Sequence, residues 1–474
     1  MTAGVSQRLT EARSEQSRSG RGHTGATPAR IMVPRVVFLV TSFSLLLFGM
    51  LMIYSSSSIV GLTSSDYNHN PAYFLVRQVA FAGVGTVLAI ALAKLDYHMW
   101  SDKLLEICWG VTVLLLVVVY SPLAGLDVYG ATRWIAIGPF TLQPSEFAKV
   151  IILLVGAHIA EEFFCKGAMD STQAVKHVVI GVGIPLLLVL LQPDKGTTGV
   201  VVLTLLVMCH IAGVSARQLL AVTAVAAFLA FAYSMKDEYS RARIMTMVNP
   251  FSDPYGAGYQ LTQGFYAFGS GGLTGLGLGM SRQKYNYLPM AHNDFIFAIV
   301  GEELGLVGAL GMLLAFALLL WSGLKIAEHA PDVFGKLIAA GCTSLIIIQL
   351  LLNVGGVLGV LPLTGKPVPF VSYGGSSVMS CLLLVGLVAS VSFHSKMPET
   401  VHDVRRRQLR FAEDEYHDDT GFPRARVGRQ SAPRPGWSVV DGGRGVASSP
   451  LASSYRRRDL SQQSAVERLR GRRR

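Results

Sequence analysis

The stretch LPMAHNDFIFAIVGEELG, residues 288–305, begins one of the long apolar runs of this chain. It holds a histidine, an aspartate and two adjacent glutamates, and the apolar run continues to about residue 323. A run of about 18 or more apolar residues predicts a helix that crosses a membrane. Ionisable groups in such a helix are costly in lipid and usually face a polar interior. The stretch therefore predicts a membrane helix with a polar site near its start.

The composition extends this prediction to the whole chain. Of the 474 residues, 51% are hydrophobic and 15% are charged, whereas a soluble domain averages about 25% charged residues. We therefore expect an all-α polytopic membrane protein with about ten transmembrane helices. The predicted spans are 36–54, 75–93, 104–120, 147–160, 178–192, 198–213, 217–234, 295–323, 337–361 and 376–394.

The net charge of +11 lies in the two ends of the chain. Residues 1–35 carry +4 and residues 395–474 carry +8, which leaves −1 for the apolar region between them. Basic flanks around an even number of spans predict that both termini are cytoplasmic. We expect disordered basic tails at 1–34 and 395–474 and a transmembrane domain at 35–394. Neither tail holds a nucleic-acid-binding motif, so no nucleic-acid partner is expected.

Glycine and proline are concentrated in the loops of one side. With the N-terminus inside, the odd-to-even connections lie outside the cell. Irregular backbone at membrane depth is tolerated only when it is buried in protein or lines a wet cavity. Five such segments on one side predict extracellular loops that together form an outward-facing cavity. They are residues 130–149, 191–197, 249–260, 269–281 and 361–377.

The acidic residues of residues 288–305 each allow two interpretations. Asp294 could be the N-cap of the eighth predicted span, or it could act in the cavity as an acid or base. For Glu303 we expect structural pairing with a basic residue of a neighbouring span. For Glu302 both pairing and a role in the site stay open. His292 could join a metal site, but a lone histidine is more often a hydrogen-bonded side chain, and no metal ligand is assigned.

Other charged residues of the outer loops are candidates for binding or for support. Arg133 suits a phosphate group, because a guanidinium can donate two parallel hydrogen bonds, and an ordinary salt bridge is the alternative. Glu146 and Lys149 are spaced i, i+3, so they can meet on one helix face and form part of the cavity wall. Asp194 and Lys195 crowd a very short outer turn.

Basic residues also lie in the two longest candidate binding loops. The outer segment 235–294 carries five cations, including Arg243, and the last outer loop carries Lys366. Cations near the outer leaflet predict an anionic ligand on that side of the membrane.

The chain resembles the SEDS family (shape, elongation, division and sporulation), which includes FtsW and RodA. The resemblance covers roughly residues 36–394, and two positions depart from the family pattern. Met290 replaces a glutamate of the usual LPEAH, and Lys195 replaces an apolar residue of the usual QPDLGT. The matching segments are YSSSS (54–58), RWIAIG (133–138), QPSEFAK (143–149), QPDKGT (192–197), NPF (249–251), GYQ (258–260), GGLTGLGLG (271–279), HNDFIFAIVGEELG (292–305) and PVPFVSYGGSS (367–377).

The resemblance implies a ten-span enzyme that polymerises lipid II into peptidoglycan strands at the outer face of the cytoplasmic membrane. The implied partners are a class B penicillin-binding protein and other proteins of the division machinery. Asp294 matches the family's essential acid and is the expected general base of an inverting transfer. A divalent cation, Mg²⁺ or Mn²⁺, is a candidate for holding the leaving diphosphate. The expected substrate-binding residues are Arg133, Lys195, Arg243, Lys366 and Ser372, and the expected structural residues of the cavity are Glu146, Lys149, Asp194, Glu302 and Glu303.

Three alternatives stay open at this point. The same charges could escort lipid II across the membrane in a flippase, although a flippase needs polar groups through the full depth of the membrane. The chain could instead be a scaffold that recruits partners through the acidic cluster EDEYHDD (413–419). Within the enzyme interpretation, the motifs and long tails favour a role in septal cell division over an elongation role of the RodA type.

Overall fold

The computed structural model describes residues 29–101, 103–121, 125–128, 131–138, 140–236 and 238–395. The predicted tails, 1–34 and 395–474, therefore lie outside the described residues except at their inner edges. Residues 29–34 belong to the first described helix, which begins earlier than the sequence predicts.

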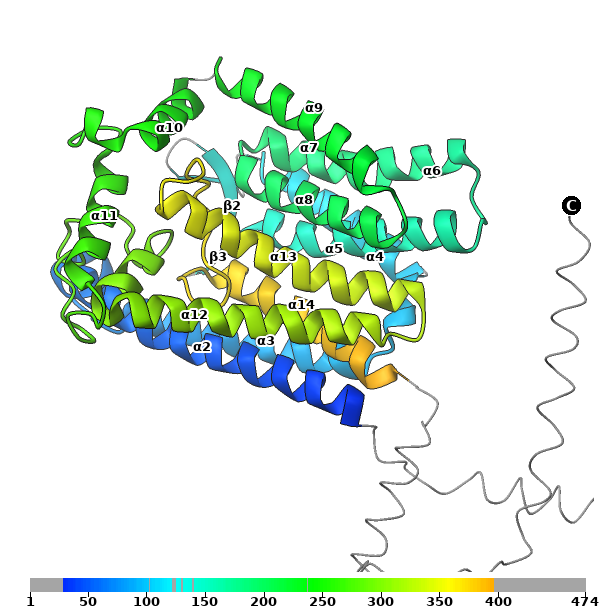
Figure 1. Ribbon diagram of the computed structural model, residues 1–474, viewed down its shortest axis with the longest axis horizontal. Coiled ribbons are helices and arrows are strands. Elements are labelled where there is room, and N and C mark those ends of the chain that lie inside the picture. The colour runs from blue at the N-terminus through cyan, green and yellow to red at the C-terminus, as the bar shows by residue number, and fades with distance from the viewer. Residues whose placement is uncertain are drawn as a thin grey trace, which may run out of the picture. The chain divides into compact units, whose positions relative to one another are not determined.

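Helices that run side by side make up most of the described chain (Figure 1). Each of the ten predicted spans overlaps a helix, although several boundaries differ. The helices are α2 (Ala29–Thr63), α3 (Tyr73–Lys94), α4 (Lys103–Val118), α5 (Pro144–Ala160), α6 (Ser171–His177), α7 (Ile184–Leu191), α8 (Lys195–Ile211), α9 (Ala216–Ser234), α10 (Glu238–Val248), α11 (Tyr259–Gly271), α12 (Ile296–Glu328), α13 (Val333–Val357) and α14 (Gly375–His394).

Length and composition identify the membrane-spanning part of the chain. Among the described residues six helical segments are long and apolar enough to cross a bilayer. Two shorter apolar helices, Lys195–Ile211 and Ala216–Phe228, lie beside them in sequence. The chain is therefore a multi-pass membrane protein, and the count of ten spans stays a prediction. The six segments are Met32–Thr63, Tyr73–Lys94, Ser171–Leu191, Ile296–Glu328, Val333–Val357 and Gly375–His394.

The predicted helical membrane fold is confirmed, and a small sheet that the sequence does not predict lies in one of its loops. The strands β1 (Gly125–Val128), β2 (Ala131–Ile137) and β3 (Phe140–Leu142) form an antiparallel sheet in the order β1-β2-β3. In the second pair of strands, Ile137 pairs with Phe140. The described strands before α5 pair their backbone hydrogen bonds in this way, where the sequence predicts only irregular backbone.

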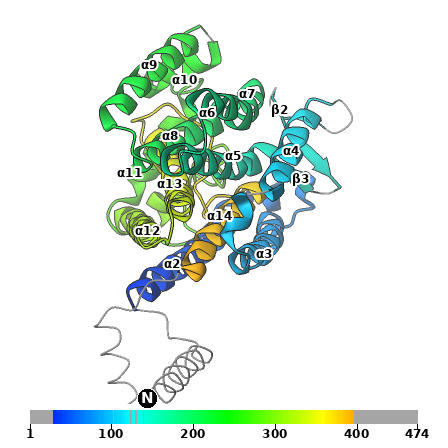
Figure 2. The same cartoon turned by 90° about the vertical axis from the view of Figure 1, so that its right-hand side faces the viewer.

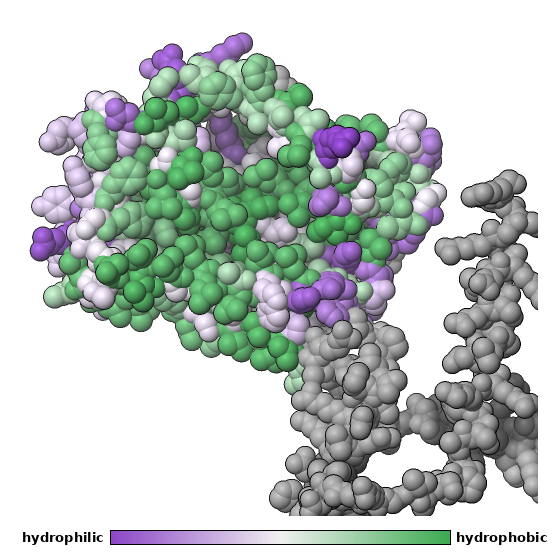
Figure 3. Space-filling view, in the orientation of Figure 1, coloured by the Kyte–Doolittle hydropathy of each residue, from purple (hydrophilic) through white to green (hydrophobic). Residues whose placement is uncertain are grey.

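The helices α13 and α14 form the centre of the bundle. In the most apolar window of each helix, 83% of α13 and 89% of α14 is buried, against 22% of α3. Figure 2 shows α13 end-on among α5, α8, α12 and α14, and each of these helices packs against it. The opposite faces of the outer helices give the apolar surface of Figure 3, which suits contact with lipid.

The helix α12 is interrupted at Gly305, whose backbone lies in a left-handed conformation (φ 68°, ψ −167°). The segment after α11 runs beside this break: the amides of Leu276 and Gly277 donate to the carbonyls of Glu302 and Glu303 at 3.0 and 2.9 Å. A Cβ at Gly305 would lie 2.3 Å from the backbone nitrogen of Gly275, so only glycine fits there. The break thus joins a short first half of α12 to the preceding loop.

The two ends of the bundle differ (Figure 1). One end, which we call the loop-rich end, holds α10, α11 and the connection between α13 and α14. The first turn of α2 and the last turn of α14 lie at the other end. The long predicted outer segment 235–294 is therefore partly helical, because α10 and α11 fall within it.

Candidate functional site at the loop-rich end

Asp294 lies just before α12 and does not cap it. The helix begins at Ile296, its N-cap is Phe295, and no side chain accepts a hydrogen bond at that cap. Asp294 is partly buried, and within the described part of the chain no group donates a hydrogen bond to its carboxylate. The structure thus removes the interpretation of Asp294 as a helix cap and leaves a carboxylate available for chemistry.

Two cations surround this carboxylate. A Cβ built at Gly365 would lie 3.5 Å from Oδ2 of Asp294 and 3.8 Å from a guanidinium nitrogen of Arg243. Burial raises the pKa of Asp294 above its ordinary value, and the positive charges of Arg243 and Lys366 partly oppose this rise. A carboxylate with a raised pKa is a better proton acceptor than an exposed one. The environment of Asp294 therefore suits a general base.

Arg243 and Lys195 connect α10 to the rest of the site. A guanidinium nitrogen of Arg243 donates to the carbonyl of Leu363. Nζ of Lys195 donates to Oγ of Ser240 at 2.6 Å. Because these contacts join α10 to the start of α8 and to the connection between α13 and α14, α10 forms one wall of the site. Figure 3 shows that the surface is hollowed beneath the segment of α9 and α10, with hydrophilic atoms inside the hollow.

Lys366 belongs to a buried cluster of charges beside the base. Its Nζ lies 2.9 Å from a carboxylate oxygen of Asp194 and 3.7 Å from one of Glu146. Glu146 also pairs with Lys149 at 2.6 Å, and Lys149 donates to Gln349 at 2.8 Å. The prediction that Glu146 and Lys149 meet on one helix face is confirmed. All four charged side chains are almost fully buried.

Asp194 is held as an anion by several donors. Thr197 donates from its amide at 3.1 Å and from its hydroxyl at 2.8 Å, and Ser145 donates at 2.9 Å. Burial opposes ionisation of Asp194, but Lys366 and these donors hold its pKa well below the ordinary range. These contacts favour a supporting role for Asp194, which stays a prediction.

Arg133 and Ser372 make structural contacts where the sequence predicts substrate contacts. Arg133 donates to the carbonyls of Gln192 at 2.9 Å and Pro193 at 2.6 Å, and so holds the turn before α8. Ser372 is buried, and its Oγ accepts a hydrogen bond from the amide of Val368 at 2.8 Å. Both side chains are occupied by backbone groups, which the sequence pattern does not reveal.

Glu302 and Glu303 bind the loop that precedes α12. Glu303 lies 3.3 Å from Nζ of Lys284 and accepts from Ser55 at 2.7 Å. Glu302 accepts from the amide of Arg282 at 2.9 Å and from the hydroxyl of Ser281. The predicted pairing of Glu303 with a cation is confirmed, but the cation comes from the preceding loop and not from a neighbouring span. The carboxylate of Glu302 is held by the same loop, which favours a structural role, and its role in the site stays a prediction.

Two buried amide side chains of α13 lie near the site and are not among the residues that the sequence predicts for it. Gln349 donates to the carbonyl of Pro367 at 2.8 Å, and Asn353 donates to the carbonyls of Asp294 and Lys366. Two amide side chains spaced i, i+4 in an otherwise apolar span are the signal that could have identified them.

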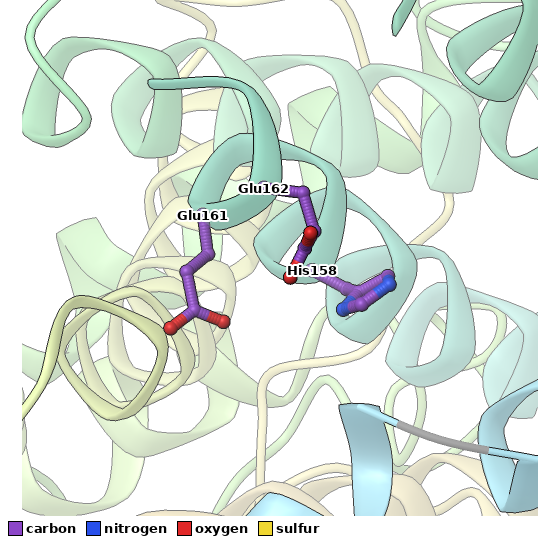
Figure 4. Close-up of side chains that lie close together, drawn as sticks. All are labelled: His158, Glu161 and Glu162. Carbon is purple, nitrogen blue, oxygen red and sulfur yellow. The ribbon is translucent and has the colours of Figure 1, made fainter. Parts of the chain in front are cut away.

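The donors around Asp294 do not fit a resident divalent ion. Such an ion needs several oxygen ligands, whereas Asp294 is a single carboxylate beside two cations and the nearby acids are already paired. Within the described residues, the group that could hold a metal is His158, Glu161 and Glu162, at the far end of α5 (Figure 4). Lys166 already contacts both glutamates, at 3.4 and 2.7 Å. The divalent cation stays a prediction, for an ion that arrives with the diphosphate.

Comparisons with known proteins find relatives that match most of this chain. Stage V sporulation protein E of Bacillus subtilis is 38% identical over 77% of this chain and 98% of its own length. A probable peptidoglycan glycosyltransferase FtsW of Geobacter metallireducens is 36% identical over 76% of this chain and 95% of its own length. A solved structure of a peptidoglycan synthase complex, described as coordinating polymerization and crosslinking, matches with a TM-score of 0.61 and 26% identity over 76% of this chain and 98% of the other.

The profile of the FtsW, RodA and SpoVE family of cell cycle proteins matches residues 35–397. This range contains every described element of the bundle except the first turn of α2, and it includes Asp294 and the buried charge cluster. The chain belongs to the FtsW/RodA/SpoVE family.

Proposed function

We propose that this protein is a peptidoglycan glycosyltransferase that polymerises lipid II. The observation that carries the proposal is the carboxylate of Asp294, which accepts no hydrogen bond from a described group and whose pKa is lowered by the charges of Arg243 and Lys366 against the effect of burial. The FtsW relative is named as a probable enzyme of this kind. A single base beside cations suits glycosyl transfer from a diphosphate, which needs a base for the acceptor and positive charge for the leaving group.

The proposed step follows from these positions. A hydroxyl of the acceptor sugar loses its proton to Asp294, and its oxygen forms a bond to the anomeric carbon of the donor. The bond from that carbon to the polyprenyl diphosphate breaks, and the configuration inverts. Arg243 and Lys195, which are more accessible than Lys366, face the departing charge. Lys366 is bound to Asp194 and acts on Asp294 through its field.

We also propose that the loop-rich end faces the exterior and that both termini are cytoplasmic. The first turn of α2 and the last turn of α14 lie at the other end of the bundle (Figure 1), and the terminal segments are basic, which favours the cytoplasm. Cysteine labelling of the loop-rich end with a membrane-impermeant reagent tests this orientation. Labelling only after the membrane is opened would contradict it.

The proposed partner is a class B penicillin-binding protein, which would crosslink the product. The structural relative is described as a complex that coordinates polymerization and crosslinking. We propose a septal role, with other division proteins as partners, because the motifs AHNDFIF and PFVSYGGSS and the long charged tails favour the FtsW type over the RodA type. Depletion of the protein should then give filamentous cells, whereas rounded cells would indicate the elongation role.

The test is a reaction of the purified protein with lipid II in detergent, with and without the penicillin-binding protein. We expect glycan strands on a gel in the presence of the partner. Failure to polymerise under any partner condition, together with translocation of lipid II across vesicles, would replace the enzyme with a flippase. The reaction should leave polyprenyl diphosphate as its second product, which mass spectrometry detects.

A further inference from the structure

The buried face of α13 carries two amide side chains, Gln349 and Asn353, four residues apart. This spacing puts them one above the other on one side of the helix. Gln349 joins Lys149 to the carbonyl of Pro367. Asn353 lies one turn further along, toward the loop-rich end, where it contacts the backbone of Asp294.

Asn353 ties together the two segments that carry the base and its nearest buried cation. Its Nδ2 donates to the carbonyl of Asp294 at 2.8 Å and to the carbonyl of Lys366 at 2.7 Å. An amide group has two N–H bonds, and both are used here. The opposite orientation would place Oδ1 against two carbonyl oxygens, so the chemistry fixes the direction of this side chain.

The oxygen of the Asn353 side chain lowers the stability of the fold. Oδ1 of Asn353 is buried and has no partner among the described residues. A buried acceptor without a donor destabilises a fold, so a purely structural position would favour an apolar side chain. The two hydrogen bonds from Nδ2 offset this cost by holding a geometry that an apolar side chain cannot hold.

We propose that Asn353 is a positioning residue that fixes the distance between Asp294 and Lys366. The helix α13 serves as the rigid reference, because most of it is buried in the centre of the bundle. Without Asn353, no side chain of α13 bonds both loops. The distance between the ammonium of Lys366 and the carboxylate of Asp294 then varies more. The role of Asn353 in turnover depends on the proposed function, whereas its effect on the charge of Asp294 does not.

Two charged groups act directly on Asp294, and two further titratable groups lie near this site. Arg243 of α10 and Lys366 of the last loop lower its pKa against the effect of burial. His292, in the same loop as Asp294, is buried, which lowers its pKa to about 4 and keeps it neutral near pH 7. Asp194, which faces Lys366, stays ionised. A weaker contribution of Lys366 should therefore raise the pKa of Asp294.

The test compares Asn353→Leu with Gln349→Leu as its control. Both variants remove a buried amide of α13 that supports the last loop, but only Asn353 touches the segment of Asp294. The acid limb of the pH profile of polymerisation should move to higher pH by about half a unit or more in Asn353→Leu, and it should not move in Gln349→Leu. Asn353→Ser, which keeps one donor, replaces Asn353→Leu if that variant does not fold.

A second readout needs no lipid II. Carbodiimide labels protonated carboxyl groups, and mass spectrometry gives the pH midpoint of labelling at Asp294. This midpoint should rise in Asn353→Leu and stay constant in Gln349→Leu. A midpoint that is unchanged in both variants, or that moves equally in both, overturns the inference. Absence of polymerisation by the unmodified protein would instead count against the proposed function, and the labelling would still decide the role of Asn353.

Discussion

Asp294 and the pair Glu302 and Glu303 lie within ten residues of each other, yet their surroundings differ completely. Glu302 and Glu303 are fully buried and accept hydrogen bonds from the loop 281–284. Asp294 is partly buried and accepts none from the described residues. The residue type is nearly the same in both places, so the difference in function comes from the donors. Satisfied acids fasten a broken helix to its loop, and the unsatisfied acid remains available for a substrate.

The most direct test of this difference neutralises one acid from each region and compares the effects on activity and on stability. In Asp294→Asn, polymerisation should fall by about 100-fold or more, because removal of a general base typically costs a factor of 10²–10⁴. Its thermal stability should stay close to that of the unmodified protein, since no donor loses a partner. Activity on lipid II and thermal unfolding in detergent measure the two effects.

The matched control is Glu302→Gln. Its side-chain nitrogen would face the amide of Arg282 or the hydroxyl of Ser281, so stability should fall by about 1–3 kcal/mol. Activity per folded molecule should persist. Equal activity losses in Asp294→Asn and Glu302→Gln would show that hydrogen-bond partners do not separate the two kinds of acid.

The next largest effect is expected on stability, when the buried charge cluster loses its Lys366 cation. Lys366→Met removes the cation between Asp194 and Glu146 and leaves two acids without it, so stability should fall by about 3–5 kcal/mol. Thermal unfolding measures this loss. The double variant Lys366→Met with Asp194→Asn should recover part of it, because the asparagine keeps an N-cap acceptor and carries no charge. No recovery would mean that Lys366 stabilises the site by packing alone.

Smaller changes in stability and in KM should distinguish a structural cation, Arg133, from a substrate-binding cation, Lys195. Arg133→Lys keeps the charge but cannot donate in the same way to the carbonyls of both Gln192 and Pro193. We expect a loss of about 1 kcal/mol in stability and little change in the KM for lipid II. Lys195→Met is the comparison, because Lys195 is exposed beside α10 and its loss should raise KM. A raised KM in Arg133→Lys would restore Arg133 as a phosphate contact.

The sequence predicts the helices of this fold well, for a physical reason. A membrane span needs a continuous apolar run, and such runs are visible without knowledge of their neighbours. The small sheet at residues 125–142 is missed, because short strands in a glycine-rich loop depend on pairing with one another and not on a long periodic pattern. The extent of α10 and α11 is missed because they lie within a loop of mixed polarity.

The site is predicted in part for a similar reason. The ionisable residues Glu146, Lys149 and Asp294 stand out in an apolar chain, so they can be identified from the sequence. Their partners cannot, because a partner such as Lys284 or Asn353 is set by tertiary contacts. Arg133 illustrates the limit: a guanidinium suits a phosphate, but it also suits two backbone carbonyls, and only the packing of the turn before α8 decides between them.

The smallest expected effect on stability concerns His98, at the other end of the bundle. Unlike Asp294, this titratable side chain has partners of opposite charge. Its two ring nitrogens lie 2.7 Å from Asp96 and 2.6 Å from Asp332, and both can donate only in the protonated ring. Burial opposes protonation, but the two acids raise the pKa of His98.

A group whose pKa is raised by folding stabilises the folded state fully at pH values below its pKa in the unfolded chain, which is about 6.5 for histidine. This contribution is lost as the pH rises through the pKa of the folded state. His98→Gln should therefore lower stability at pH 6 and have little effect at pH 9. Because the pair is partly exposed, the change should stay below about 1 kcal/mol. Thermal unfolding at the two pH values measures it, and an equal loss at both would mean that His98 stabilises the loop without its charge.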